Sequence, residues 1–173
     1  MGRRKKKIVH ELEIIDVAED GKCVAKKDDL VVFVKGVVPG DVVDAKVTKK
    51  RKNYLEAQAV QFHKKSTDRV DAFCEHFGLC GGCKWQHLTY EKQLEYKQKV
   101  VVDSLERIGK VEIPEVLPIL PSRKNRFYRN KLEFTFSAHR WLSQEEVDSG
   151  ESFADTRALG FHVPGLFDKV VDI

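Results

Sequence analysis

The chain has 173 residues, enough for one large domain or two small ones, and 42% of them are hydrophobic, as in an ordinary globular core. Charged residues make up 34% of the chain, and the apolar runs have the length of strands, far below the ~20 residues that a membrane-spanning helix needs. This composition argues against a membrane protein. The net charge of only +4 excludes a uniformly basic molecule, although basic residues gather in three local clusters.

Residues 1–7 form a basic tail, with Lys or Arg at every position from 3 to 7. The tail is either a phosphate contact or a solvated extension, and both interpretations stay open. No apolar stretch typical of a secretory signal peptide follows it, so we expect a cytoplasmic protein. Thiols are kept reduced in the cytoplasm, and clustered cysteines there indicate metal ligands rather than disulfides.

Residues 8–62 contain five short runs in which apolar and polar side chains alternate, as in half-buried strands. The expected strands cover residues 10–17, 23–25, 30–34, 41–48 and 54–62. Asp20-Gly21 is a hairpin signal, and Pro39 and Gly40 suit the two central positions of a type II turn. Five short strands in this space predict a small antiparallel barrel of the oligonucleotide-binding type.

A second basic cluster, made of Lys49, Lys50, Arg51 and Lys52, follows the fourth expected strand. On a barrel loop these side chains can follow a phosphate backbone, and the neighbouring Tyr54 can stack on a base, which is worth ~1–3 kcal/mol. A run of lysines between two strands is often only a solvated turn. We favour an RNA contact because barrels of this class bind nucleic acid.

Residues 63–73 are polar and are expected to form a linker. The segment behind it carries Cys74, Cys80 and Cys83 at C-x5-C-x2-C spacing among several glycines. Thiolates at this spacing can bind one metal centre, because a glycine-rich backbone can turn its amides toward sulfur. Three thiolates are one short of a closed tetrahedral set, and a histidine would complete a zinc site of the Cys3His type.

One long helix is expected between Thr89, which suits the N-cap position, and Gly109, which suits the C-terminal end. Its apolar residues recur at helical spacing and are Leu94, Val101, Leu105 and Ile108. Three prolines then keep the chain extended, at Pro114, Pro118 and Pro121.

The third basic cluster interleaves Arg126, Arg129 and Lys131 with Phe127 and Tyr128, and an RNA contact and a solvated surface are equally open for it. Beyond it we expect strands over residues 132–137, 158–162 and 169–173, with a polar, acidic loop over residues 144–151. The fold class is therefore mainly β with one long helix. A five-stranded barrel precedes an α+β domain over residues 74–173, which we expect to be truncated because the sequence stops within its last strand.

Three stretches resemble one family of enzymes. Cys74 and the string CGGCKWQHL at residues 80–88 resemble the iron–sulfur segment of the RNA (uracil-5-)-methyltransferases, in particular those that act on 23S ribosomal RNA. The string LVVFVKGVVPGD at residues 30–41 resembles the TRAM domain, the RNA-binding barrel that precedes this segment in the family. YRNK at residues 128–131 resembles the start of the family's central sheet, so the resemblance covers nearly the whole chain.

The resemblance implies that Cys74, Cys80 and Cys83 hold a [4Fe-4S] cluster, with a fourth cysteine ligand beyond residue 173. The alternative is that the cluster is lost or replaced by zinc. The family's S-adenosylmethionine-binding domain and catalytic cysteine lie further downstream, so we expect no catalytic residue here and no activity from this stretch alone. Cys23 is a poor nucleophile, because burial in a strand raises the pKa of a thiol.

The expected function is therefore RNA recognition and scaffolding for an S-adenosylmethionine-dependent 23S rRNA (uracil-5-)-methyltransferase. The expected partner is large-subunit ribosomal RNA, without membrane contact, and the expected state is a monomer. The competing interpretation is a stand-alone TRAM-type RNA-binding module with a structural zinc site and no catalysis.

Overall fold

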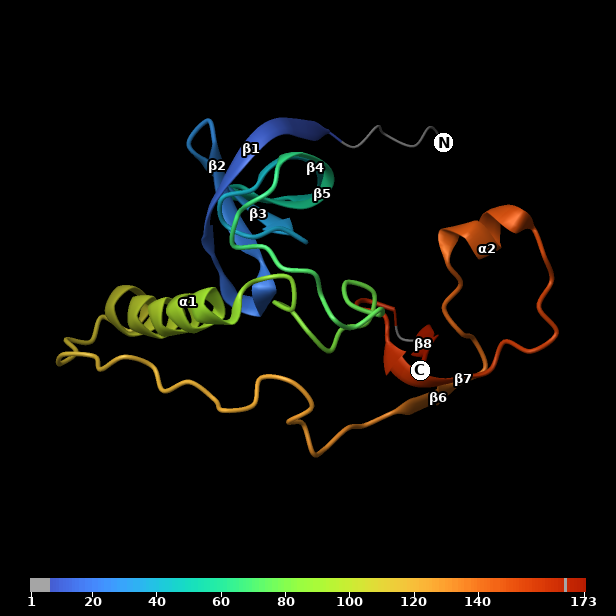
Figure 1. Ribbon diagram of the computed structural model, residues 1–173. Helices are drawn as coiled ribbons and strands as arrows, with labels where there is room; N and C mark the ends of the chain where they lie inside the picture. The colour runs from blue at the N-terminus through green and yellow to red at the C-terminus, as the bar shows by residue number, and fades with distance from the viewer. Residues whose placement is uncertain (1–6, 167) are drawn as a thin grey trace. The chain divides into compact units, whose positions relative to one another are not determined.

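The structure is a computed structural model that describes residues 7–166 and 168–173 (Figure 1). The basic tail therefore lies outside the described residues, apart from Lys7. The described residues form two compact units, one with residues 7–71 and 87–123, and the other with residues 72–86 and the described part of 124–173. No helix within the described ranges is long and apolar enough to cross a membrane.

A closed five-stranded barrel forms most of the first unit, with the strand order β1-β2-β3-β5-β4. Its strands are β1 (Ile8–Val17), β2 (Cys23–Lys27), β3 (Leu30–Lys35), β4 (Val42–Lys50) and β5 (Tyr54–Lys64). The predicted barrel is confirmed. One pairing is not antiparallel as expected, since β3 and β5 run parallel. An odd number of strands cannot close with antiparallel neighbours throughout, so closure itself requires a parallel pair.

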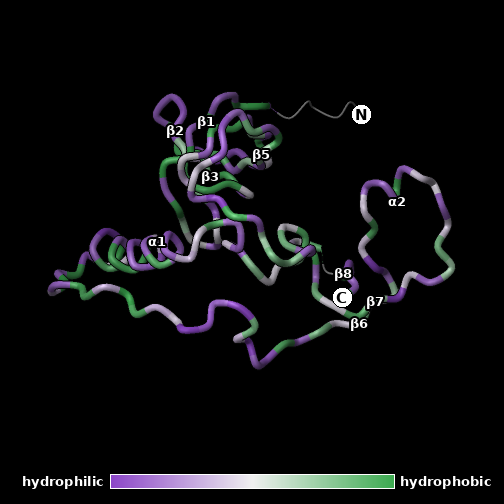
Figure 2. The backbone as a smooth tube through the Cα atoms, viewed as in Figure 1, coloured by the Kyte–Doolittle hydropathy of each residue, from purple (hydrophilic) through white to green (hydrophobic). Residues whose placement is uncertain are grey.

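Alternate side chains of the strands fill the barrel, and hydrophobic residues recur along the strands in Figure 2. Leu12 and Ile14 of β1, and Val32 and Val34 of β3, are each at most 1% exposed. Full burial of such a side chain is worth ~1.5–3 kcal/mol, so this interior stabilises the closed barrel. The residues between them face outward, because successive strand side chains point to opposite faces.

The turn between β3 and β4 has the predicted type II form. Gly40 has a φ of +89°, which is the left-handed conformation that this position needs. The Asp41 N–H donates to the Val38 carbonyl at 3.1 Å and closes the turn. At the β1–β2 connection, Asp20 and Gly21 likewise have φ values of 59° and 68°, in agreement with the predicted hairpin turn.

The predicted long helix consists of α1 (Tyr90–Asp103), which continues in a π-helical turn over Ser104–Ile108. Thr89 is the N-cap residue, as expected, although its side chain makes no capping hydrogen bond. Gly109 ends the helix through a bond from its N–H to the Ser104 carbonyl at 2.8 Å. Its conformation is right-handed, so glycine is needed here for space, because an added Cβ would lie 2.8 Å from the Leu105 carbonyl oxygen.

One salt bridge of Lys99 joins α1 to the barrel, and a second lies within the helix. Lys99 Nζ lies 2.7 Å from an Asp16 carboxylate oxygen of β1 and 2.6 Å from one of Asp103. The predicted apolar positions do not form a buried face, since Val101 is 57% exposed and Ile108 is 76% exposed. The Lys99–Asp16 salt bridge is thus a polar contact that ties the helix to the barrel.

The second unit holds a three-stranded antiparallel sheet of β6 (Thr135–Ser137), β7 (Ala158–His162) and β8 (Val170–Asp172). The two later strands were predicted closely, whereas the first is shorter than expected. The acidic stretch was wrongly expected to be a loop, because it contains the short helix α2 (Gln144–Ser149). Ser143 and Glu146 form a reciprocal capping box, and Gly150 ends the helix with a φ of +67°.

Candidate nucleic-acid interface

The basic cluster at residues 49–52 lies partly on a strand and partly in a turn. Lys49 and Lys50 end β4, whereas Arg51 and Lys52 belong to the turn before Tyr54, the first residue of β5. All four basic side chains are exposed. The Arg51 N–H donates to the Tyr54 carbonyl at 2.9 Å, which makes the turn tight. The cluster therefore presents its cations together at one end of the barrel.

An ion pair does not neutralise this cluster. Lys49 Nζ lies 3.9 Å from a carboxylate oxygen of Glu56, and the Lys49 side chain is 48% exposed. Exposed pairs of this kind contribute only ~0–1 kcal/mol. The Lys49 ammonium group thus remains available to a phosphate.

Further basic groups lie at the same end of the barrel, around a small hollow of about 210 Å³. Lys7 and Lys27 contribute to its lining together with Leu55, which pairs with Lys50 across the β4–β5 ladder. The Val47 N–H also donates to the Lys7 carbonyl at 2.8 Å, so the strand ends lie side by side. Lys27 was not a predicted site residue, and Lys7 belongs to the basic tail, for which a phosphate contact was left open. The strand order places them here, because it brings the start of β1 beside β4 and beside β2.

Tyr54 contacts a second aromatic ring that the sequence had not singled out. Its ring centroid lies 5.4 Å from that of Phe33, with an angle of 80° between the ring planes. Both side chains are half-buried on the outer face of the barrel. The signal in the sequence was the alternation of β3, in which Val32 and Val34 point inward and Phe33 must point outward.

A carboxylate flanked by two imidazoles links three barrel strands. Asp44 of β4 accepts a hydrogen bond from the Glu11 N–H at 2.9 Å, and it contacts His63 Nε2 and His10 Nδ1 at 2.7 Å each. These contacts hold the pKa of Asp44 well below its usual range, with the Glu11 amide as the largest cause. Glu11 lies where the β1–β4 register shifts, so the cluster serves to fix this irregular pairing.

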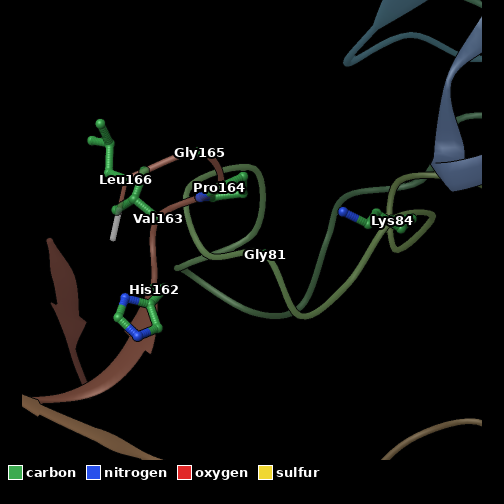
Figure 3. Close-up of a pocket in the computed structure, with 7 residues that line it drawn as sticks. All are labelled: Gly81, Lys84, His162, Val163, Pro164, Gly165 and Leu166. Carbon is green, nitrogen blue, oxygen red and sulfur yellow. The ribbon is translucent and has the colours of Figure 1, made fainter. Parts of the chain in front are cut away.

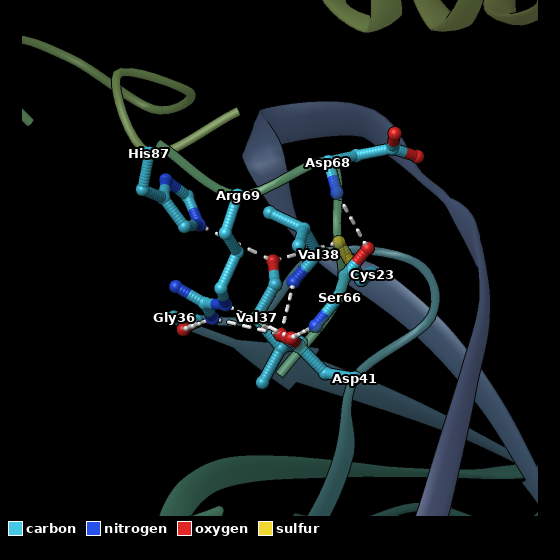
Figure 4. A network of polar contacts seen from close by, with 9 residues as sticks. All are labelled: Cys23, Gly36, Val37, Val38, Asp41, Ser66, Asp68, Arg69 and His87. Carbon is cyan, nitrogen blue, oxygen red and sulfur yellow. Dashed lines mark hydrogen bonds and ion pairs between the residues drawn. The ribbon is translucent and has the colours of Figure 1, made fainter. Parts of the chain in front are cut away.

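The expected linker after β5 is fixed to the barrel by a buried ion pair (Figure 4). Asp41 is fully buried, and the Arg69 guanidinium donates to both of its carboxylate oxygens, at 2.7 Å through Nη2 and 2.9 Å through Nε. The backbone amides of Val38 and Ser66 complete the shell at 2.8 and 2.9 Å. Burial alone would raise the pKa of Asp41, but these hydrogen bonds outweigh it and hold the pKa below its usual value.

The third basic cluster lies in the second unit, in an exposed segment without regular structure. The Arg126 guanidinium carbon lies 4.8 Å from the centroid of the Phe73 ring, which is a cation–π contact. Arg129 Nε donates to the Lys131 carbonyl at 3.0 Å, and Lys131 Nζ lies 3.0 Å from Glu133. These side chains are accessible, but their present contacts are to the protein itself, and their role in RNA binding stays a prediction.

The cysteine segment is folded by two successive turns. The Phe77 N–H donates to the Cys74 carbonyl at 3.0 Å, and the Cys80 N–H donates to the His76 carbonyl at 3.1 Å. Between them, Gly78 has a φ of +88°, so one of the glycines has the left-handed conformation that the sequence suggested. The Gly81 N–H then donates to the His162 carbonyl at 3.4 Å and ties the segment to the end of β7.

A shallow hollow of about 530 Å³ lies beside this segment (Figure 3). Pro164 lies over the Gly81 turn, where a Cβ at Gly81 would come within 3.3 Å of Pro164 Cγ. The titratable side chains of the lining are Lys84 and His162. No carboxylate or thiol is among its lining residues.

The three cysteines of the segment do not form a metal site as they are placed. Cys74 and Cys80 are half-buried, Cys83 is exposed, and all three are free thiols. Within residues 7–166 and 168–173, no set of three or more Cys, His, Asp or Glu side chains is arranged to hold a metal ion. The present arrangement therefore does not fit a metal centre, and no chemical step is assigned to one.

Cys23 behaves as the sequence indicated. It is buried in β2, and its thiol donates to the Val37 carbonyl at 3.1 Å. Burial, followed by the nearby carboxylate of Asp41, raises the pKa of Cys23 to about 12. The thiol is therefore protonated at neutral pH and is unsuited to nucleophilic catalysis.

Comparison with known proteins gives a consistent picture. Residues 5–60 match the TRAM domain family. Over 157 residues, or 91% of its length, the chain is 56% identical to an uncharacterized RNA methyltransferase of Bacteroides thetaiotaomicron. Over its whole length it is 38% identical to the 23S rRNA (uracil(1939)-C(5))-methyltransferase RlmD of Francisella tularensis subsp. novicida. The chain spans 35% and 41% of the lengths of these two relatives.

A solved structure is also similar, namely the tRNA (uracil-54, C5)-methyltransferase of Pyrococcus abyssi in complex with S-adenosyl-L-homocysteine. The sequence identity is 25% and the TM-score is 0.49, over 95% of this chain and 31% of that one.

Proposed function

We propose that the chain recognises RNA for a methyltransferase of the uracil-C5 RNA methyltransferase family. The premise is that the chain carries a TRAM domain and is a homologue of these enzymes. The observation that carries the proposal is the closed TRAM barrel with the cations of residues 49–52 gathered at one end. Phosphate contacts of exposed lysines and arginines supply most of the affinity of such surfaces for RNA.

The proposed substrate is large-subunit ribosomal RNA, which the relative from Francisella is named for. In this proposal residues 8–62 are the RNA-binding barrel, residues 63–73 are the linker, and residues 74–173 begin the iron–sulfur and central domain. The chain acts as a monomer in the cytoplasm, where ribosomal RNA is modified. The S-adenosylmethionine site and the nucleophile belong to a longer protein of which this chain is the N-terminal part.

The assignment of RNA recognition to this chain and of catalysis to another part of the protein rests on the chemistry of uracil-C5 methylation. A thiolate must add to C6 of the base, and a base must remove the proton at C5. Cys23 cannot supply this thiolate at neutral pH, because its pKa is about 12. Cys74, Cys80 and Cys83 are proposed cluster ligands, whose sulfurs iron would occupy, so the chain's own proposed contribution is to bind the RNA and to orient it.

The cysteine segment enters the proposal as a candidate iron–sulfur site, on the strength of its C-x5-C-x2-C spacing and its glycines. The thiolates that would hold the cluster are those of Cys74, Cys80 and Cys83. Such a cluster would fix the conformation of the segment. As described, the three cysteines form no metal-binding group, so the segment would have to close around the metal. Zinc held by the same cysteines is the second candidate.

The function is tested by mixing the chain with a 23S rRNA fragment and S-adenosylmethionine that carries a tritiated methyl group. We expect saturable RNA binding and no tritium in the RNA. Absence of RNA binding at low salt would overturn the proposed recognition. Transfer of tritium to C5 of a uridine would instead overturn the assignment of catalysis to another part of the protein.

A further inference from the structure

The outer face of β3 and β5 presents an aromatic pair. Val32 and Val34 are 0% exposed and point into the barrel, so Phe33 between them points outward. In β5, Leu55 and Ala57 point inward at 7% and 2% exposure, which places Tyr54 on the same outer face as Phe33. The parallel pairing sets Tyr54 opposite Val31, one step along the face from Phe33.

The geometry of this pair leaves aromatic surface open. The two rings meet edge to face, with 5.4 Å between their centroids and 80° between their planes. In such a contact the edge of one ring covers one face of the other ring, and the remaining ring faces take no part in it. Both residues are half-buried rather than enclosed. Aromatic side chains on the outside of a barrel add nothing to its core, and a partly open ring can stack on a nucleobase whatever the base identity.

Positive charge flanks the Tyr54 end of the pair. Lys26 of β2 pairs with Val31, so Lys26, Val31 and Tyr54 form one row across three strands. Arg51 and Lys52 of the basic cluster form a basic turn that leads directly into Tyr54, and the Arg51 N–H donates to the Tyr54 carbonyl at 2.9 Å. The Phe33 end differs, because Glu56 pairs with Phe33 and its carboxylate lies 3.9 Å from Lys49 Nζ, so the two charges there have opposite sign. A phosphate backbone is therefore attracted to the Tyr54 side of the face.

We propose that Phe33 and Tyr54 form a stacking platform for an unpaired base of single-stranded RNA, with Lys26 and the basic turn holding the adjoining phosphates. This inference rests on the proposed RNA-binding function and adds the class of RNA that the barrel selects. Duplex RNA keeps its base faces inside the helical stack, so it can satisfy the cations but not the aromatic pair.

The test measures binding of the 173-residue chain to a single-stranded oligouridine and to an RNA duplex of the same length. We expect Tyr54→Leu and Phe33→Leu each to weaken binding of the single strand about tenfold, within the range of base stacking on aromatic residues. Binding of the duplex should not change. The slope of log affinity against log salt should also stay constant, because no charge is removed.

Three controls separate stacking from damage to the fold. Tyr54→Phe keeps the ring and should bind as the parent chain does. Ile15→Ala removes an exposed side chain from β1, which neighbours neither β3 nor β5, and should have no effect. An oligonucleotide without bases should bind the parent chain and Tyr54→Leu equally.

The outcomes distinguish this inference from the proposed function. If the parent chain binds neither RNA, the proposed function itself fails. If the parent chain binds both RNAs, the platform is refuted when Tyr54→Leu and Phe33→Leu weaken the binding of neither RNA, or weaken the binding of both RNAs equally. RNA recognition stands in either case. The platform is supported only by a loss confined to the single strand and restored in Tyr54→Phe.

Discussion

Asp41 is a buried charge that serves the fold rather than catalysis. Its carboxylate receives hydrogen bonds from Arg69 and from the amides of Val38 and Ser66. Each of these hydrogen bonds favours the ionised form of the carboxylate. Through them, the Asp41 carboxylate both closes the β3–β4 turn and holds the segment that contains Ser66 and Arg69 to the barrel. Removal of the charge should therefore weaken both.

We predict that Asp41→Asn lowers the free energy of unfolding by ~3–5 kcal/mol at neutral pH, since it leaves Arg69 without its partner in a half-buried position. The pKa of Asp41 is lower in the folded chain than in the unfolded one. Its contribution is therefore present above the unfolded value of about 3.9 and is lost as the pH falls toward the folded value.

Urea unfolding of both proteins across acidic and neutral pH measures this effect. The two stability curves should converge below about pH 4. A constant difference down to the lowest pH would show that the Asp41 charge is not responsible.

The Cys23 thiol should be protected from alkylation in the native chain. Its pKa of about 12 and its burial keep it protonated and inaccessible, whereas the other three cysteines are at least partly exposed. In metal-free protein, iodoacetamide at neutral pH should modify Cys74, Cys80 and Cys83, and should modify Cys23 only after denaturation. Peptide mass mapping checks the order of reaction, and rapid native labelling of Cys23 would contradict its placement in the core.

At the scale of elements, the turn between β3 and β4 depends on Gly40. Its φ of +89° disfavours a side chain, and an added Cβ would lie 2.9 Å from Ser66 Oγ. Gly36 is a matched control in the same unit, with a φ of +79° but only the flexible end of Gln58 nearby, at 3.3 Å. Alanine should cost ~1–2 kcal/mol at Gly36 for the backbone conformation, and more at Gly40. Denaturant unfolding compares the two, and equal losses would show that the contact with Ser66 is unimportant.

The metal content of the cysteine segment can be measured directly. Protein purified without oxygen should contain iron and sulfide in equal amounts, and Cys80→Ser should lose both. Cys23→Ser is the matched control and should keep them, because Cys23 lies inside the barrel. Stoichiometric zinc without iron would contradict the iron–sulfur assignment and favour the zinc alternative.

The barrel and the long helix could be predicted because their signals are local. Alternation in β1 and β3, Pro39 and Gly40 in the turn, and Thr89 at the helix start each act within a few residues. The parallel β3–β5 pairing could not be read locally, since it arises from closure of the whole sheet. Helix α2 was missed although Ser143 and Glu146 show its capping pattern, because the acidic residues around them suggested a loop.

Prediction of the candidate site was more limited. The sequence singled out the basic cluster and Tyr54 as expected RNA contacts, which stay predictions, but it did not single out Phe33, which meets Tyr54 only through a parallel pairing of strands. It also did not find the cluster of Asp44, His10 and His63, which joins residues from three strands. Contacts between residues far apart in sequence depend on register, and register is what local patterns leave undetermined.

At the scale of the whole molecule, the described chain forms two compact units and spans 35% to 41% of the lengths of its relatives from Bacteroides and Francisella. The TRAM barrel, its basic turn and the homology to RNA methyltransferases all support the proposed recognition of RNA. The central claim is therefore that the cations at the barrel end contact phosphates.

The salt dependence of RNA affinity tests this claim most directly. In the double variant Lys50→Gln/Lys52→Gln, the slope of log affinity against log salt should flatten by about 0.7 for each phosphate of single-stranded RNA that is no longer neutralised. The matched control Lys97→Gln/Lys110→Gln removes the same charge from exposed positions outside the barrel and should keep the parent slope. If the barrel variant keeps the parent slope, or if the control flattens as much, the barrel end is not the RNA-binding surface.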